Sequence, residues 1–575
     1  MSLKNTKFSL FKVMLNQLTY SLPEKLETAV QTKFDDWQKE NKISRVWEKD
    51  ASVWTNDDEA KWLGWLDIAE TELSDVQKYR DFAEDVEDFS DVALLGMGGS
   101  SLCPEVFSIT FGKQNFHILD STVPAQIKTL ESKIDLAKTL FIVASKSGST
   151  LEPNTFKQYF FQKVSQVVGK ENAGKQFIAI TDPNSKMQQV AERDNFRKIF
   201  FGNSEIGGRF SALSVFGLVP ASAMRIDVED FLTRTMEMVQ ACRNNDPSEN
   251  PGAILGTILG VCQTSGRDKL TIFTSKEIYD VGAWLEQLIA ESTGKSDISI
   301  IPVDREKIQP PKNYGNDRVF AYLKLKDDSD EQEDAIAELE KAGQPVVRIQ
   351  IADKLNLGQE FFRWEFATAV AGSIMQINTF NQPDVESAKI EAKKLTEEYE
   401  RTGKLPDEKP FYEENGIKLF ADERNLTELN KTVGNEKSLK SYLKAHLDKI
   451  KENDYFALLA YIEMNRENEN LLQEIRHQVL QEKRVATCLG FGPRFLHSTG
   501  QAYKGGANEG VFLQVTSNDA TDLRVPGQKY TFGIVKAAQA RGDFQVLLDR
   551  SRRALRVHLG ENAAEDLRKL AEIIC

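Results

Sequence analysis

The chain has 575 residues, of which 41% are hydrophobic and 28% are charged, and its formal net charge is −14. A chain of this length and composition can bury several cores, so we expect two to four domains of an ordinary soluble protein. The negative charge disfavours general binding to nucleic acid or anionic membranes, because their phosphates would be repelled.

The cysteines are odd in number, far apart and never in a CxxC or Cys/His-ligand spacing, which predicts neither a disulfide framework nor a zinc site. They are Cys103, Cys242, Cys262, Cys488 and Cys575. The chain starts with a polar segment of mixed charge, and no apolar run approaches the roughly 18 residues of a membrane span. We therefore expect no signal peptide or membrane anchor, and a reducing cytoplasmic location.

Residues 1–88 have helical spacing, as in KWLGWLDIAETEL, and are predicted to form a helical N-terminal segment. From residue 89 the helical spacing gives way to short apolar runs, each ending at Gly, Ser, Thr or Asp. These runs are DVALL, NFHIL, TLFIVA and KQFIAIT. Helical stretches separate these runs. The pattern favours an α/β fold with a parallel sheet over residues 89–248.

A second set of strands, KLTIFTS, SDISIIPVD, RVFAYLKL and PVVRIQI, predicts another parallel α/β domain over residues 249–400. The polar stretch RTGKLPDEKPFYEENG, broken by Pro and Gly, then marks a boundary. Residues 410–575 are expected to form a smaller C-terminal α/β domain, with RVATCLGF, GVFLQVT and FGIVKAA as strands.

The stretch SKSGST, Ser145–Thr150, directly follows the predicted strand LFIVA. A loop at the carboxyl end of a parallel strand opens the crevice where α/β sheets bind ligands, and the next helix offers unpaired N–H groups. Four hydroxyls and a lysine, with no carboxylate among the six residues, favour a phosphate site. An ordinary Ser-rich turn that caps a helix is the alternative.

Two glycine-rich loops are further candidates. GMGGSS, Gly96–Ser101, follows DVALL but lacks the third glycine of a dinucleotide motif, so we favour close approach to a phosphosugar over NAD binding. A tight turn remains equally open. In GGRFS, Gly207–Ser211, paired glycines would let the Arg209 fork approach an oxygen that gains negative charge. A structural salt bridge is the alternative for this arginine.

In WLEQLIAESTGK, Gln287 and Glu291 are an i,i+4 pair on one helix face, away from an apolar stripe. Glu291 lies in the last turn before Gly294, where a carboxylate could serve as a general base. Most glutamates near helix ends are solvated and inert, so this position alone is weak support for catalysis.

Together, GMGGSS, SKSGSTLEP, EIGGRFS, EQLIAESTGK and FNQPDVESAK closely resemble, in this order, the phosphoglucose isomerase family. The resemblance covers about residues 90–400. It implies two sugar-isomerase (SIS) domains with flavodoxin-like parallel sheets, flanked by helices. Asp384 stands where the family usually has glycine, while Gln382 and Lys389 are retained.

The resemblance also implies the roles of individual residues. Glu291 would carry the proton between C2 and C1 of glucose 6-phosphate and fructose 6-phosphate, Arg209 would stabilise the cis-enediolate, and Lys389 would assist ring opening. The residues implied to bind substrate are Gly99, Ser100, Ser145, Lys146, Ser147, Thr150, Gly208, Gln287 and Gln382. Such an aldose–ketose isomerisation needs a base, a cation and a phosphate anchor, so we expect no cofactor and no metal.

The family opens the sugar ring with a histidine, often in an HS-x-GQ context, between the glutamate and the lysine. No histidine occurs here between His117 and His446, but HSTGQ at 497–501 has that context. We therefore assign ring opening to His497, delivered by the C-terminal domain, because a near-neutral pKa suits the task. A structural histidine at a turn is the alternative.

This layout is similar to the isomerase half of transaldolase–phosphoglucose isomerase fusions, and the sequence leaves open whether the chain is part of a fusion or free-standing. The family implies a homodimer, while the histidine could act within its chain or across the interface. Two other functions remain open. One is a non-catalytic SIS-type sugar-phosphate sensor, and the other is an isomerase of a related sugar phosphate such as mannose 6-phosphate.

Overall fold

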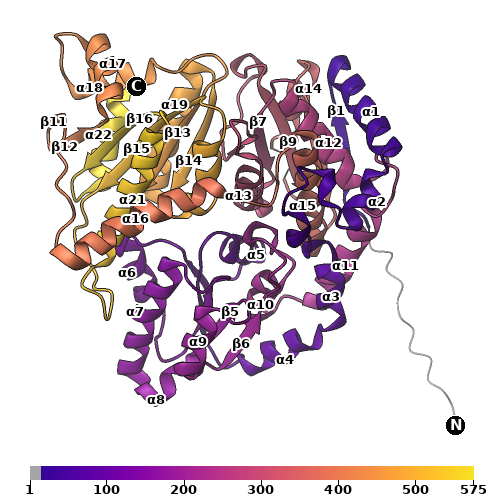
Figure 1. The fold of residues 1–575 in the computed structure, drawn as a ribbon, viewed down its shortest axis with the longest axis horizontal. Helices are drawn as coiled ribbons and strands as arrows, with labels where there is room; N and C mark the ends of the chain where they lie inside the picture. Colours follow the sequence, from indigo (N-terminus) through magenta and orange to yellow (C-terminus); the bar gives the residue numbers. More distant parts are fainter. Residues whose placement is uncertain (1–13, 330, 575) are drawn as a thin grey trace.

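A computed structural model describes residues 14–329 and 331–574. It is an α/β structure with three sheets, which Figure 1 shows with the first at the bottom, the second at the upper right and the third at the upper left. Within the described residues, no helix is long and apolar enough to cross a membrane. Residues 1–13 of the expected helical N-terminal segment, and Cys575, lie outside the described residues.

The first sheet is entirely parallel, with the order β3-β2-β4-β5-β6. Its strands are β2 (Asp91–Leu95), β3 (Phe116–Leu119), β4 (Thr139–Ala144), β5 (Phe177–Thr181) and β6 (Lys198–Phe201). The helices that connect them are α5 (Leu102–Thr110), α6 (Pro124–Lys133), α7 (Leu151–Val168), α8 (Lys170–Ala173) and α9 (Lys186–Arg193). The central strands are buried on both faces, which explains their continuous apolar sequence.

The second sheet has the order β1-β10-β9-β7-β8. Its strands are β1 (Gln17–Ser21), β7 (Lys269–Thr274), β8 (Ile301–Asp304), β9 (Arg318–Leu325) and β10 (Val346–Ile351), and its connecting helices are α13 (Val281–Thr293), α14 (Glu333–Lys341) and α15 (Leu357–Ile374). Strand β1 corrects the expectation of a purely helical N-terminal segment. It pairs antiparallel with β10, a strand that lies more than 300 residues further along the sequence.

The third sheet has the order β11-β12-β16-β15-β13-β14. Its strands are β11 (Tyr412–Glu414), β12 (Ile417–Phe420), β13 (Tyr455–Tyr461), β14 (Ala486–Phe491), β15 (Gly510–Ser517) and β16 (Arg553–Leu559). Its helices are α17 (Glu423–Val433), α18 (Leu439–Leu447), α19 (Arg466–Lys483), α20 (Gly500–Gly505), α21 (Phe532–Asp549) and α22 (Ala563–Ile574). The parallel part confirms the expected C-terminal α/β structure.

One predicted strand of this region is wrong. FGIVKAA is the first part of helix α21, and the Thr531 side chain caps that helix by accepting a hydrogen bond from the Ile534 N–H. A short apolar run fits a buried helix and a buried strand equally well, and only its helical continuation to Asp549 separates the two. The sequence patterns did not predict β11, β12, β13 and β16 of this sheet, nor β6 of the first sheet.

The parallel strands of all three sheets follow one winding pattern. The chain begins at a central strand, adds the next strand on one side, and then crosses to the other side, as in β2, β3 and β4. Ligands of such sheets bind at the carboxyl ends of the strands where the winding reverses. In the first sheet this point lies between β2 and β4, which are followed by GMGGSS and SKSGST.

One apolar cluster extends from the N-terminal helices through the first and second sheets. One face of the third sheet packs on a cluster of its own, and its other face shares a cluster with α13, β8 and α16. The N-terminal helices are α1 (Glu24–Lys39), α2 (Lys42–Trp47), α3 (Trp65–Ser74) and α4 (Gln77–Asp85). Three helices follow the first sheet, α10 (Val215–Ala223), α11 (Val228–Ala241) and α12 (Pro251–Thr264). The residue boundaries proposed for the domains stay a prediction.

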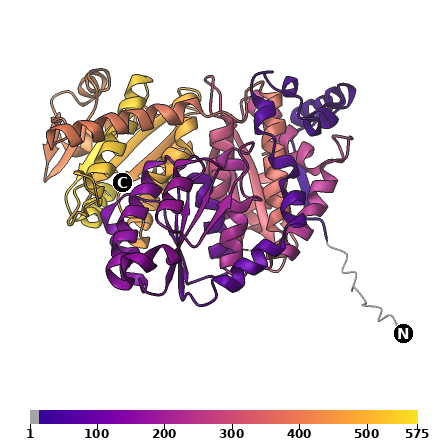
Figure 2. The same cartoon turned by 60° about the horizontal axis from the view of Figure 1, so that its bottom comes forward.

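Helix α16 (Pro383–Thr402) joins the second part of the chain to the third. It packs along α21 and contacts α20, and Figure 2 shows it lying across the third sheet, while the first sheet and its helices face the junction of the other two. FNQPDVESAK and HSTGQAYKGG are thereby brought together, because the first begins α16 and the second contains α20.

A fully buried ion pair also ties the second sheet to the third. Arg318 Nη1 lies 3.1 Å from Glu306 Oε1, and both side chains are wholly inaccessible. The other Glu306 oxygen accepts hydrogen bonds from the Thr487 backbone N–H and hydroxyl, at 3.0 and 2.9 Å. Glu306 therefore satisfies donors from β9 and β14 at once.

Glu306→Gln should destabilise the protein by about 3 kcal/mol, because it leaves the Arg318 charge buried without a counter-ion. The measurement is the midpoint of urea unfolding. Glu397→Gln is the control, since Glu397 pairs with Lys393 at 3.6 Å on the surface and should change stability by about 0.5 kcal/mol or less. Equal midpoints for the two variants would contradict the importance of the buried pair.

Candidate active site

The SKSGST loop connects β4 to α7 at the carboxyl edge of the first sheet. Gly148 has φ +66°, and a side chain there would meet the backbone nitrogen of Met187 at 2.3 Å, so the loop requires glycine at this point. Lys146 Nζ pairs with Asp182 Oδ2 at 2.5 Å and donates to the Asn203 carbonyl at 3.1 Å. Ser145, Ser147 and Thr150 of this loop line a cavity, beside a lysine whose charge is already paired with a carboxylate.

The two glycine loops touch each other. Gly98–Ser100 forms a single turn after β2, and Gly208–Phe210 forms another turn after β6. A Cβ atom added to Gly99 would lie 1.9 Å from the carbonyl oxygen of Gly208. Glycine at position 99 thus permits the close approach of the two loops, and it brings Arg209 beside the carboxyl end of β2.

The Arg209 guanidinium is 2% exposed and is held by several acceptors. Its Nε donates to the Ser292 hydroxyl at 2.7 Å, and its Nη1 donates to Gln382 Oε1 at 2.9 Å. Its Nη2 donates to the carbonyls of Thr379 and Asn381, at 2.7 and 3.1 Å. Burial lowers the pKa of Arg209, and the neighbouring Glu291 carboxylate opposes that fall.

Glu291 lies in the last turn of α13, and its side chain faces this arginine. Glu291 Oε1 is 3.4 Å from Arg209 Nη1, while Oε2 accepts a hydrogen bond from Gln287 Nε2 at 3.1 Å. The same Gln287 amide donates to the His497 backbone carbonyl at 2.8 Å. One helix turn therefore connects the carboxylate, the arginine and the histidine segment.

His497 reaches the site from the third sheet of the same chain, in the short turn Arg494–His497. Its Nε2 lies 3.0 Å from Glu152 Oε1, which also accepts a 2.6 Å hydrogen bond from Gln539 Nε2. The Thr122 hydroxyl donates to Gln539 Oε1 at 2.6 Å and so fixes the orientation of the amide. Burial acts to raise the pKa of Glu152, but the positive field and hydrogen bond of His497 outweigh it, and the pKa is lowered.

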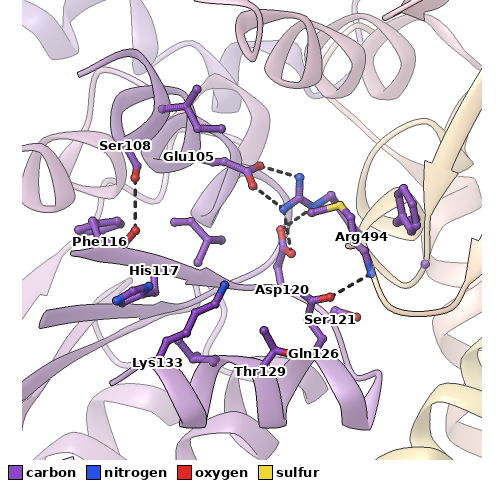
Figure 3. Close-up of a pocket in the computed structure, with 16 residues that line it drawn as sticks. Glu105, Ser108, Phe116, His117, Asp120, Ser121, Gln126, Thr129, Lys133 and Arg494 are labelled. Atoms are coloured by element: carbon purple, nitrogen blue, oxygen red, sulfur yellow. Dashed lines mark hydrogen bonds and ion pairs between the residues drawn. The ribbon is translucent and has the colours of Figure 1, made fainter. Parts of the chain in front are cut away.

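An arginine anchors the histidine turn to the first sheet. Arg494 makes two hydrogen bonds with the Glu105 carboxylate, at 2.6 and 2.9 Å, and its Nε lies 2.9 Å from Asp120 Oδ2. Figure 3 shows the guanidinium between the two carboxylates, beside a neighbouring cavity. Two charged partners from the first sheet therefore fix the position of a turn that belongs to the third.

Asp384, where the family usually has glycine, is used in the contact between α16 and the third sheet. Gln501 Oε1 accepts hydrogen bonds from the backbone N–H groups of Asp384 and Val385, and Gln501 Nε2 donates to Asp384 Oδ2 at 2.8 Å. Arg550 also pairs with Asp384. A carboxylate at the first turn of a helix is favourable as well, so the departure from glycine has a structural reason.

Lys389 lies two turns into α16 and is the most accessible of the predicted catalytic residues, with 42% of its side chain exposed. Its Nζ pairs with Glu386 Oε1 at 2.9 Å. Gln382 lies immediately before α16 and is joined to Arg209. The lysine therefore stands at the rim of the site, whereas the glutamine is fixed within it.

One cavity of 370 Å³ is lined by most of these groups. Of the predicted site residues, those that line it are Gly99, Ser100, Ser145, Lys146, Ser147, Thr150, Gly208, Gln287, Glu291, Gln382, Lys389 and His497. Arg209 lies behind this lining and reaches the site through Glu291 and Gln382. Among the described residues, no group of three His, Cys, Asp or Glu side chains could hold a metal ion.

Several polar partners of the site were not predicted from the sequence. Glu152 stands inside the quoted motif SKSGSTLEP, and Asp182 follows the strand FIAIT, so the shared carboxyl edge of the sheet could have indicated both. Gln539 could not be found, because its helix was interpreted as a strand. Arg494 gave no signal, since its partners lie more than 370 residues away.

A family model described as phosphoglucose isomerase matches residues 79–309. Glucose-6-phosphate isomerase of Methanocaldococcus jannaschii is 27% identical over 364 residues, which are 57% of this chain and 88% of that protein. The enzyme of the same name from Campylobacter jejuni is 27% identical over 384 residues, 58% of this chain and 92% of that protein.

Two solved structures share the fold. A hypothetical protein of Thermus thermophilus has a TM-score of 0.56 at 23% identity, over 66% of this chain and 99% of that chain. A glucose-6-phosphate isomerase of Chlamydia trachomatis has a TM-score of 0.52 at 19% identity, over 66% of this chain and 88% of that chain. The fold and the sequence matches define the chain as an isomerase. Its sequence is similar to the phosphoglucose isomerase family over residues 79–309 and to the two relatives named above.

Gly99→Ala should lower stability by about 2 kcal/mol, because the added Cβ would force the two glycine loops apart. The thermal unfolding midpoint is the measurement. Gly208→Ala is the matched control, since a Cβ there would meet nothing within 4 Å and the residue has negative φ. An equally stable Gly99→Ala protein would contradict the close approach of the loops.

The stability difference between the wild type and Glu152→Gln should depend on pH. The pKa of Glu152 is lowered in the folded protein, so its stabilising effect is complete above the ordinary glutamate pKa of about 4.3 and is lost as the pH falls through the lowered value. Urea unfolding of both proteins between pH 7 and pH 3 is the measurement. A difference that grows toward low pH would refute this ion pair.

Proposed function

We propose that the protein interconverts glucose 6-phosphate and fructose 6-phosphate through a cis-enediol(ate). The relatives named glucose-6-phosphate isomerase support this substrate pair. One observation carries the mechanism: Glu291 and the fixed Arg209 guanidinium are 3.4 Å apart at a cavity that the hydroxyl loop Ser145–Thr150 also lines. Base, cation and phosphate anchor are thus combined at one site.

In this mechanism Glu291 removes the proton from C2 and returns it to C1. The developing negative charge on the substrate oxygens is stabilised by Arg209, whose hydrogen bonds are already formed and so need no rearrangement during the reaction. Gln287 orients the carboxylate by donating to Oε2. The hydroxyls of Ser145, Ser147 and Thr150 hold the phosphate, together with the backbone near Gly99 and Gly208.

Ring opening is assigned to His497, paired with Glu152. The carboxylate accepts a hydrogen bond from the ring nitrogen Nε2 and stabilises the imidazolium that forms when the other nitrogen takes a proton. Lys389 and Gln382 would assist from the start of α16. Because one chain supplies all of these side chains to the cavity, the histidine needs no partner subunit to reach it. The homodimer and the cytoplasmic location stay predictions.

Glu291→Gln should lower kcat about 10³-fold in both directions, because the amide cannot accept the proton. His497→Ala should lose about 10²-fold on cyclic substrate and little on substrate supplied in its open-chain form. A coupled assay of glucose 6-phosphate and fructose 6-phosphate measures both effects.

The matched control is His477→Ala, since His477 lies on α19 and accepts a hydrogen bond from the Lys307 N–H, away from the cavity. This variant should keep full activity. Glu152→Gln should behave as His497→Ala does. Full activity of Glu291→Gln would refute the proposed base, and equal losses of His497→Ala on both substrate forms would refute its assignment to ring opening.

A further inference from the structure

The third sheet carries a second polar cavity, of 230 Å³, that shares no lining residue with the substrate cavity. It lies between strands β12 and β16, the carboxyl end of β15 and helix α21. Four cationic side chains line it: Lys418, Lys536, Arg541 and Arg556. Pockets for drug-sized ligands have about 300–1,000 Å³, so this cavity suits a small occupant.

The charges of this cavity do not balance. Glu408 is the carboxylate among the lining residues, and Asp519 pairs with Lys536 Nζ at 2.7 Å from just outside. Asp522 also acts electrostatically on Lys536, so four cations face three carboxylates and one positive charge is in excess, or two when Glu408 is displaced. The surplus stands out in a chain whose net charge is −14. Arg556 and Lys536 are only 4% and 3% exposed, so water screens their charges weakly.

The positive charges of this cavity also act on the pKa of a histidine that lines it. His558 accepts or donates through both ring nitrogens, to the Thr516 hydroxyl at 2.9 Å and to Asn518 Oδ1 at 3.0 Å. Burial, together with the nearby charges of Arg556, Lys536, Lys418 and Arg541, lowers its pKa to about 4. The ring is therefore neutral at pH 7 and adds hydrogen-bonding capacity without charge.

Glu408 occupies this cavity as an internal anion. Its Oε2 lies 2.6 Å from Arg541 Nε and 2.9 Å from Arg556 Nη2, so one oxygen is shared by two guanidinium groups. It comes from the polar segment that follows α16, and Arg541 Nη1 also holds that segment through the Pro406 carbonyl at 2.7 Å. Two arginines that share one carboxylate oxygen have donors in the geometry that binds phosphate.

We propose that this cavity is a second anion site, which binds a phosphate dianion, either free or as a small monoester, in competition with Glu408. A dianion with three acceptor oxygens neutralises the two charges that are in excess when Glu408 is displaced, whereas one carboxylate neutralises only part of the cluster. The site is separate from the chemistry at Glu291. It therefore goes beyond the isomerase activity and does not depend on it.

The experiment is a calorimetric titration of the full chain with inorganic phosphate at fixed ionic strength. Glu408→Gln removes the competing charge and should tighten binding at this site about tenfold, while Arg541→Gln should weaken it about tenfold. The controls are Glu482→Gln on α19 and Lys440→Gln on α18, which change the same net charges at exposed positions away from this cavity. Phosphate binding at the substrate cavity is common to all these proteins and cancels in the comparison.

Two outcomes would overturn the proposal. In one, the titrations of Glu408→Gln and the wild type superimpose. In the other, Glu408→Gln binds phosphate more weakly, which would mean that Glu408 only holds its own segment in place. The thermal unfolding midpoint checks that each variant is folded, and the Glu408→Gln result decides the question if Arg541→Gln does not fold. Repeating the titration with glycerol 3-phosphate shows whether the site prefers the monoester or the free ion.

Discussion

The site depends on the buried guanidinium of Arg209. Its donors reach Ser292 on α13, Gln382 before α16 and two carbonyls of the segment between α15 and α16. One side chain that follows the first sheet therefore holds both the end of α13 and the segment that leads into α16. A buried charge of this kind is stable only when its donors are satisfied. The same requirement therefore holds the proposed base, the glutamine and the start of α16 in one arrangement.

Repeated winding explains where the polar loops meet. In each sheet the chain crosses from one side of its first parallel strand to the other. In the first sheet this makes β2 and β4 neighbours, so the loops GMGGSS and SKSGST that follow them lie next to one another. The third sheet uses the same order for a different purpose. It delivers His497 and Gln501 to the others through a turn that Arg494 anchors to the first sheet.

Much of this could be predicted from short stretches of sequence. Strands β2 to β5 and β7 to β10 follow from local patterns, and the cavity is lined by twelve of the thirteen residues that the sequence predicts for the site, His497 among them. Their roles stay a prediction. The failures have a common physical cause. Strand β1 pairs with β10, Gln539 bonds to Glu152, and Arg494 bonds to Glu105 across several hundred residues. No local pattern encodes such pairings, and FGIVKAA shows that a short apolar run does not distinguish helix from strand.

One face of the third sheet packs on an apolar core of its own, whereas its other face shares a core with α13, β8 and α16. Local opening that separates the third sheet from the second must break this shared core and the Glu306–Thr487 hydrogen bonds, but the loop Ser145–Thr150, Arg209 and Glu291 all lie on elements outside the third sheet. Under the roles proposed here, such a partly open molecule would still exchange the proton of an acyclic sugar but could no longer open the ring. Damage to the protein would thus appear first as a change in which form of the sugar it accepts.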